Sequence, residues 1–325
     1  MRRRLYVIFA LSFTLFMALP AQAEQSAMAL LERMSIATKQ LNYDGVFTYQ
    51  SGKRIQAIRI IHKWNHNGEV ERLLSLNGAA RELIRTDDIV TCIFPEGRQV
   101  NINRRPLGRG FPSNLLKGLN SASTYYKVTL GEEGRVANRK ARQLIVSPVD
   151  NFRYGYNLWV DEESALLLQS DLLTEDGTVL EQFAFSSITL DLHIPDDQLA
   201  PQMTGHQMSW NRIETVNPGD IKEKDSTWTT NWLPEGFELV AHQHRRVSNN
   251  KQLVEQSVYS DGLTSVSVFV EKSMHKKRHL NGLSTMGAVN AYGRVVNDYF
   301  VTVVGQAPRH TIEKIGQSIQ VTSHD

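Results

Sequence analysis

Residues 54–94 have the sequence RIQAIRIIHKWNHNGEVERLLSLNGAARELIRTDDIVTCIF. Short apolar runs alternate here with the pairs Asn67-Gly68, Asn77-Gly78 and Asp87-Asp88, which recur about every ten residues. Asn-Gly between extended apolar runs is the strongest short-range signal for a β-hairpin. The stretch therefore predicts an antiparallel meander.

Several predicted strands of this meander are apolar on both faces. The runs at 54–64, 89–94 and 165–173 all show this pattern. An antiparallel sheet with one wet face alternates apolar and polar residues, so a second apolar face has to be covered. A strongly curved sheet partly wrapped around helices fits, and a closed barrel or sandwich fits the periodicity equally well.

A helix precedes the meander, and more strands follow it. Ala27, Leu30, Leu31 and Met34 recur at helical spacing, and Asn42 is a candidate terminator. A second short helix is expected at 112–122. The later strands are expected at 124–130, 141–147, 155–160, 165–173 and 178–187, with a turn at Asp176-Gly177.

The strand pattern fades after residue 200 and then returns. Residues 206–220 are rich in turn formers and predict a linker between 24–205 and a smaller α+β domain at 221–325. In that domain strands are expected at 238–247, 252–260, 264–271, 286–296 and 299–304, with turns at Asp261-Gly262 and Asn297-Asp298. An amphipathic helix is expected from about Pro308.

The first 23 residues have the order of a secretory signal peptide. Arg2, Arg3 and Arg4 precede the uncharged apolar segment 5–19, and Ala21-Gln-Ala23 is a small-x-small cleavage site. We expect an exported protein that begins near Glu24. The alternative is an N-terminal anchor that stays uncleaved.

Removal of this segment changes the charge balance. Without its three arginines, 36 Lys and Arg become 33, against 34 Asp and Glu. A nearly neutral mature chain makes nucleic acid an unsuitable partner. Recognition by charge then depends on local patches.

The sequence contains no motif for catalysis or for a cofactor. G-x-S-x-G, P-loop and H-E-x-x-H patterns are all missing. His275 and His279 enclose three cations that would repel a metal ion. His242 and His244 would share one face of a strand, but no third ligand is obvious, and a solvated face is the simpler interpretation. We expect no enzyme, no metal and no cofactor.

Cys92 is the single cysteine, so an internal disulfide is excluded. Its position within an apolar strand favours a small buried hydrophobic side chain. An intermolecular disulfide or a redox role is the alternative.

Basic residues gather in two places. One is the 104–109 segment, and the other joins 272–279 to nearby arginines. Simple solubility explains such clusters, and docking of an acidic partner or a lipid phosphate is the functional alternative. The candidates for partner contact are Arg245, Arg246, Lys276, Lys277 and Arg278.

Several segments resemble one known family along the whole mature chain. The segments are 41–49 (LNYDGVFTY), 232–237 (WLPEGF), 258–269 (VYSDGLTSVSVF), 287–292 (GAVNAY) and 303–305 (VVG). Together they are similar to the RseB/MucB family, periplasmic negative regulators of the sigma-E (AlgU) envelope stress response.

The resemblance implies a fold and a function. The fold would be a large unclosed antiparallel β-barrel with covering helices, similar to LolA and LppX, plus the smaller α+β domain. The function would be binding of the periplasmic domain of an RseA/MucA-type anti-sigma factor. Binding would shield that factor from site-1 proteolysis until lipopolysaccharide or lipoprotein acyl chains release it. Homo-oligomer formation stays open, as do a lipoprotein carrier and an unrecognised hydrolase.

An apolar cleft for acyl chains is expected in the large domain. The two-sided strands and the carrier resemblance motivate it, although strand parity alone does not select the lining face. Its candidate residues are Trp64, Leu74, Phe94, Trp159, Leu168 and Phe183.

Overall fold

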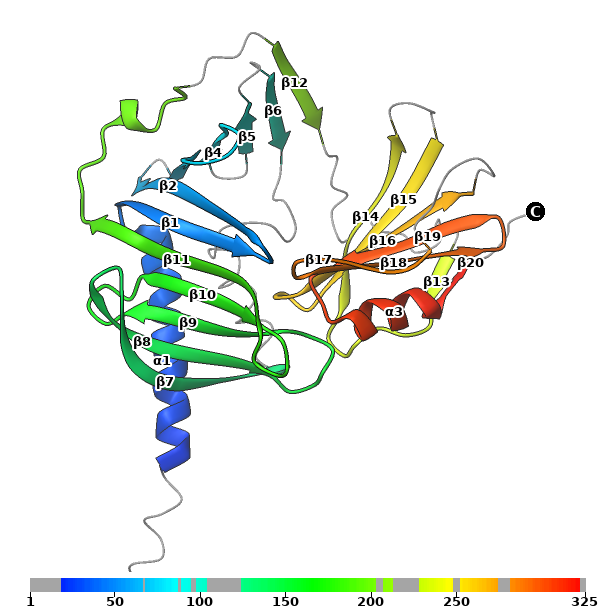
Figure 1. The fold of residues 1–325 in the computed structure, drawn as a ribbon, viewed down its shortest axis with the longest axis horizontal. Helices are drawn as coiled ribbons and strands as arrows, with labels where there is room; N and C mark the ends of the chain where they lie inside the picture. The colour runs from blue at the N-terminus through cyan, green and yellow to red at the C-terminus, as the bar shows by residue number, and fades with distance from the viewer. Residues whose placement is uncertain are drawn as a thin grey trace, which may run out of the picture.

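The computed structural model describes residues 19–66, 68–86, 89–94, 98–103, 124–202, 207–212, 228–247, 252–273 and 281–321. Within them, two sheet domains lie side by side (Figure 1). Among the described residues, none of the helices combines the length and the hydrophobicity that a membrane span requires. The predicted helix at 112–122 lies outside the described residues.

The first domain is one large open sheet, and helix α1 (Leu19–Gln40) packs against one of its faces. Its strands run in the order β12-β6-β5-β4-β3-β2-β1-β11-β10-β9-β8-β7, and the two end strands, β12 and β7, do not pair with each other. The predicted unclosed antiparallel barrel is therefore confirmed. The strands are β1 (Tyr43–Ser51), β2 (Arg54–Asn65), β3 (Gly68–Ser75), β4 (Glu82–Thr86), β5 (Ile89–Ile93), β6 (Arg98–Asn103), β7 (Tyr126–Val136), β8 (Arg139–Pro148), β9 (Gly155–Asp161), β10 (Leu167–Leu173), β11 (Val179–Leu190) and β12 (Gln207–Arg212).

The predicted meander from β2 to β6 is confirmed by the strand register. Asn65 pairs with Gly68 at the first turn, and Thr86 pairs with Ile89 at the third. Cys92 lies half-buried in β5, and burial raises the pKa of its thiol. A raised pKa leaves less of the reactive thiolate at neutral pH.

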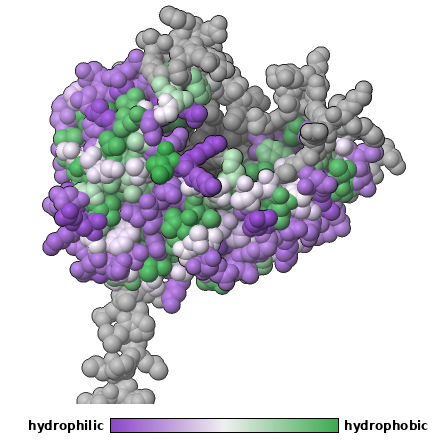
Figure 2. All heavy atoms as spheres, viewed as in Figure 1, coloured by the Kyte–Doolittle hydropathy of each residue, from purple (hydrophilic) through white to green (hydrophobic). Residues whose placement is uncertain are grey.

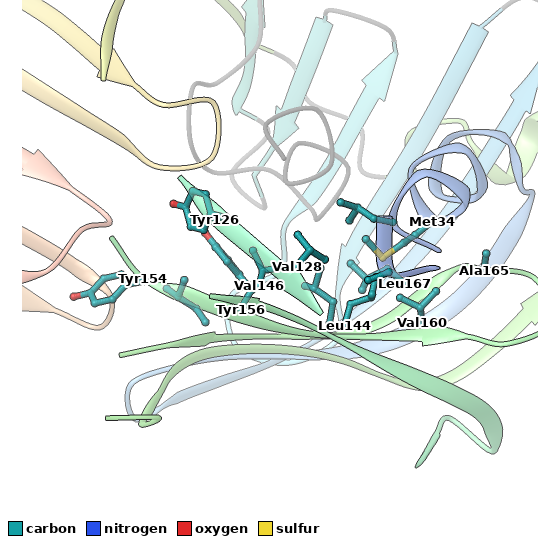
Figure 3. Packing of buried hydrophobic residues seen from close by; sticks show 14 of the residues in the cluster. Met34, Tyr126, Val128, Leu144, Val146, Tyr154, Tyr156, Val160, Ala165 and Leu167 are labelled. Carbon is teal, nitrogen blue, oxygen red and sulfur yellow. The ribbon is translucent and has the colours of Figure 1, made fainter. Parts of the chain in front are cut away.

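Helix α1 covers part of one face of this sheet. Leu31 and Met34 are almost fully buried against Leu144 and Leu158 of the strands. Figure 3 shows the same cluster continuing along the sheet from Met34 to Tyr126, at the side of the second domain. The hydrophobic core thus links α1 to the boundary between the domains.

A segment after β11, residues 191–202, covers the other face of β2 to β4. Ile194 and Leu199 pack on Ile61. The buried Arg72 donates at 2.5 Å to Glu82 and at 2.6 Å to the carbonyl oxygen of Gln198. This segment contains the short 3₁₀ helix η1 (Asp196–Gln198). Two covered faces explain why these strands lack simple alternation.

The second domain is a six-stranded antiparallel sheet with one helix. Its order is β14-β15-β16-β19-β18-β17, and α3 (Arg309–Ser318) places Ile312 and Ile315 in its core. The small β13–β20 pair completes the domain. The strands are β13 (Trp228–Thr230), β14 (Glu238–Val247), β15 (Gln252–Ser260), β16 (Ser265–Lys272), β17 (Gly282–Met286), β18 (Val289–Val296), β19 (Tyr299–Gly305) and β20 (Ile319–Val321).

Three elements differ from the sequence-based expectation. The predicted strand 286–296 is interrupted by a turn at Gly287, whose φ of 62° is left-handed, so β17 and β18 form a hairpin there. The β7–β8 hairpin extends to the Ala137-Asn138 turn. Part of the predicted linker forms β12, which pairs parallel with β6.

Candidate functional site

An ion pair crosses the boundary between the two domains. Arg153, in the β8–β9 connection, donates from Nη1 to Oδ2 of Asp261 at 2.8 Å, and neither side chain is exposed. Arg153 also donates to the carbonyl oxygen of Glu235 at 2.5 Å and contacts Asp150 of its own domain. Because each of the three guanidinium nitrogens has an acceptor, the buried charge is well compensated.

Aromatic rings surround this ion pair. The guanidinium carbon lies 4.7 Å from the ring centroid of Tyr125 and 5.3 Å from that of Phe237. The Tyr126 hydroxyl donates to Asp261 at 3.3 Å. Burial, followed by the charge of Asp261, raises the pKa of that hydroxyl, so it stays protonated and remains a donor.

A close backbone approach completes this part of the junction. Gly236 has φ of 82°, and a Cβ there would collide with the Tyr125 ring. Glycine has no Cβ, so it tolerates both the left-handed φ and the close approach of the Tyr125 ring. The WLPEGF segment of the second domain is thereby fitted to an aromatic side chain of the first.

Polar and aromatic contacts extend the junction on both sides of Arg153. Asn290 donates at 3.0 Å to the Tyr154 hydroxyl, and Thr311 donates at 3.1 Å to the carbonyl oxygen of Phe152. The Phe152 ring lies 5.0 Å from Trp232, and the ammonium of Lys314 lies 3.9 Å above the Trp232 ring. These contacts fix how the two domains sit against each other.

The two domains meet at a second place, near the β1–β2 turn of the first domain and the β17–β18 turn of the second. Gln306 of the second domain donates at 2.8 Å to Glu181, which also accepts from Ser51 at 3.0 Å. At Gly287 an added Cβ would meet the Ser51 side chain. The domains therefore touch at two separate places along one boundary.

A buried polar cluster lies on β1 to β4 of the first domain. Tyr43 stacks on His62 with 4.7 Å between ring centroids. Arg85 pairs with Glu69 at 2.6 Å and with Glu71 at 3.0 Å. Burial raises the pKa of Glu71, and the charge of Arg85 opposes that rise.

The strand register divides the candidate lipid-binding residues between two faces. Directly paired strand residues share a face. Phe183 pairs with Ser170, which pairs with Leu158, and Leu158 packs in the cluster around α1. Trp159 pairs with Gln169 and lies on the opposite face. The α1 face therefore holds Phe183 but not Trp159.

Leu168 belongs to the same buried cluster as Phe183, and Trp159 packs against that cluster, whereas the other three candidates are not among its members. Trp64 is 43% exposed at the end of β2, while Leu168 is fully buried at an irregularity of β10. Leu74 and Phe94 are half-buried in β3 and after β5. On the face drawn in Figure 2, apolar side chains of the described residues form small groups among polar ones over both domains. That these six residues line one acyl cleft stays a prediction.

Two of the candidate cations for partner contact, Arg245 and Arg246, lie near one end of β14. Arg245 pairs with Val254, and Val254 pairs with Glu271, directly before the basic 272–279 segment. Arg246 follows on β14, an edge strand. The register thus places Arg245 at the same end of the sheet as Glu271. Lys276, Lys277 and Arg278 lie outside the described residues.

Sequence reasoning missed the junction residues. The sequence predicts only a turn at Asp261, and it places residues 150–154 between two expected strands. One signal was present, because Phe152, Arg153 and Tyr154 place a cation between aromatic rings outside any strand. Such a group needs a partner surface if it is buried.

Both domains of the chain match domains of one protein family. Residues 26–203 match the MucB/RseB N-terminal domain, and residues 222–320 match the MucB/RseB C-terminal domain. The chain belongs to the MucB/RseB family. Its junction therefore joins the N-terminal and C-terminal domains of that family.

Relatives and solved structures agree over nearly the full length. The sigma factor AlgU regulatory protein MucB of Pseudomonas aeruginosa is 32% identical over 94% of each chain. The sigma-E factor regulatory protein RseB of Escherichia coli K12 is 28% identical, over 96% of this chain and 97% of its own. A solved structure of the Pseudomonas aeruginosa MucA/MucB complex is similar to this chain, with a TM-score of 0.73 at 28% identity over 92% of this chain and 99% of that one.

Proposed function

We propose that this MucB/RseB family member binds the periplasmic domain of an anti-sigma factor of the MucA/RseA type and shields it from site-1 proteolysis. In this way it keeps the sigma-E regulon off. The observation that carries the proposal is the 0.73 TM-score over 92% of the chain to a protein solved with MucA. A second similar structure is a crystal structure of MucB in complex with the periplasmic part of MucA.

The geometry supports a binding role. The buried Arg153–Asp261 pair and the Glu181–Gln306 bridge hold the two domains in one arrangement. A partner that contacts both domains then meets a preorganised surface, which lowers the entropic cost of association. The signal peptide predicted at 1–23 would direct the protein, and with it this surface, to the periplasm.

The test is a reconstituted protease assay. A purified anti-sigma periplasmic fragment is cut by its site-1 protease with and without excess full-length mature protein, and binding is measured separately by calorimetry. We expect saturable binding and slower cleavage. Unchanged cleavage with the fragment fully bound would refute shielding, and absence of binding would refute the whole proposal.

Release by lipidic signals is the second part of the proposal, and a lipoprotein carrier is the competing function. The α1 face, which holds Phe183, is the side on which an acyl chain would meet the main core. Each acyl CH₂ removed from water contributes about 0.8 kcal/mol. Lipopolysaccharide or acylated peptide should therefore lower the affinity for the anti-sigma fragment. Lipid binding without any change in that affinity would favour the carrier.

A further inference from the structure

Two histidines and a glutamate meet on the outer strands of the second domain. His242 and His244 are two residues apart on β14, so their side chains share a face. His244 pairs directly with Glu255 of β15, and His242 pairs with Ser257. The third ligand that the sequence did not reveal beside the two histidines is thus supplied by the neighbouring strand.

The three side chains are spaced for a metal ion. Their ligand atoms all lie within 4.8 Å of one another, and Nε2 of His242 lies 3.7 Å from Oε1 of Glu255. Zinc bonds of about 2.0–2.1 Å in a tetrahedron place neighbouring ligand atoms about 3.3 Å apart. His244 is exposed and Glu255 is buried. Rotation of the exposed imidazole can therefore close the remaining gap around a fixed carboxylate.

A further side chain orients one of the ligands. Nδ1 of His242 lies 2.8 Å from Oγ of Ser257, which leaves Nε2 directed to the glutamate side. A hydrogen bond to the second ring nitrogen is the usual support for a metal-bound histidine. The two imidazole rings stand at 88° to each other with centroids 5.3 Å apart, so neither stacks across the ligand atoms of the other.

We propose that His242, His244 and Glu255 form a zinc site, with Ser257 as a positioning residue. Two imidazoles and one carboxylate are a known zinc donor set, and three protein ligands leave a fourth position for water. Calcium and magnesium prefer all-oxygen sites, so the two nitrogen donors select against them.

The experiment titrates ZnCl₂ into the chelator-treated, full-length mature protein by calorimetry. We expect saturable binding of one equivalent and a zinc-dependent rise in the unfolding temperature. His244→Ala removes an exposed ligand without disturbing the core and should weaken binding by about tenfold or more. Ser257→Ala should also weaken it by about tenfold, because the orienting hydrogen bond is lost.

Controls separate this site from other histidines. His193→Ala changes an exposed histidine of the first domain and should leave binding unchanged. Glu255→Gln removes the carboxylate ligand but keeps the shape of the buried side chain, so it should also weaken zinc binding. Circular dichroism checks that this variant folds before the titration. Equal binding by His244→Ala and native protein would overturn the proposal, as would absence of saturable binding. Loss of binding in a His275→Ala/His279→Ala variant would assign the metal to that segment instead and also overturn it.

Discussion

Arg153 of the first domain and Asp261 of the second form an ion pair of 2.8 Å with both side chains fully buried. The aspartate has a local role as well, because its Oδ1 accepts the backbone N–H groups of Leu263 and Thr264. Asp261 thus stabilises the β15–β16 turn and also binds Arg153 of the first domain. Turn geometry and domain docking are coupled through this carboxylate.

Replacement of Arg153 should destabilise the junction strongly. Arg153→Met leaves the Asp261 carboxylate buried without its cation, which costs about 3–5 kcal/mol in the free energy of unfolding. Chemical denaturation should show a lower midpoint and separate transitions for the two domains. Arg59→Met is the matched control, because Arg59 pairs with Asp44 at 2.6 Å while 42% of its side chain is exposed. That control should cost about 0–1 kcal/mol, and an equal loss in both variants would contradict a special role for the junction.

A methyl group at Gly236 should separate the domains locally. Gly236→Ala combines a left-handed φ with a collision against the Tyr125 ring. We expect a loss of about 1–3 kcal/mol from backbone strain and overpacking. Gly177→Ala tests the strain alone, because Gly177 has φ of 82° with no atom within 4 Å of the added Cβ. Gly236→Ala should lose more stability than Gly177→Ala, and the reverse order would rule out the collision.

The covering segment 191–202 should detach when its anchor is removed. Arg72→Met breaks the buried pair with Glu82 and the bond to the Gln198 carbonyl oxygen, at a cost of about 3–5 kcal/mol. Hydrogen exchange at residues 191–202 should speed up. Lys63→Met removes the pair between Lys63 and the exposed Asp196 on the same segment. The segment should stay protected in that variant, and comparable exchange in both would show that Arg72 is not the anchor.

Glu71 should make the protein less stable as the pH rises. Its folded pKa is raised by burial above the ordinary value of 4.5. Between 4.5 and the raised pKa the folded protein keeps a proton that the unfolded chain has lost. The free energy of unfolding therefore falls as pH rises through this window. Glu71→Gln should flatten that part of the stability–pH curve, measured by denaturation at a series of pH values. The exposed variant Glu163→Gln is the control, and an unaltered slope in Glu71→Gln would contradict the assignment.

The basic 272–279 segment should act through charge. Reversal of Lys276, Lys277 and Arg278 to glutamate should weaken binding to the anti-sigma fragment more at low salt than at high salt. Rim charges act mainly on the association rate and are screened by salt. The measurement is the association rate constant over a range of salt concentrations. Equal affinity of native and reversed proteins at low salt would remove this cluster from the interface, and reversal of Lys53 and Arg54 is a control of equal sign in the first domain.

The sequence by itself determined the strands, most turns and the two-domain order. These features depend on neighbours in the chain: residues such as Asn77-Gly78 favour tight turns, and alternation fixes which strand residues share a face. The segments similar to the RseB/MucB family carried the functional hypothesis, and the family membership is confirmed.

Only the tertiary structure decided which distant residues meet. Arg153 and Asp261 are separated by 108 positions, and local periodicity carries no information about such a pair. The same holds for Glu255 beside His244, because the register of β14 against β15 has to be known first. Phe183 and Trp159 were equally good candidates from hydrophobicity, yet pairing through Ser170 and Gln169 places them on opposite faces. Side chains of adjacent strands become neighbours through hydrogen-bonded pairing, which is a property of the folded chain.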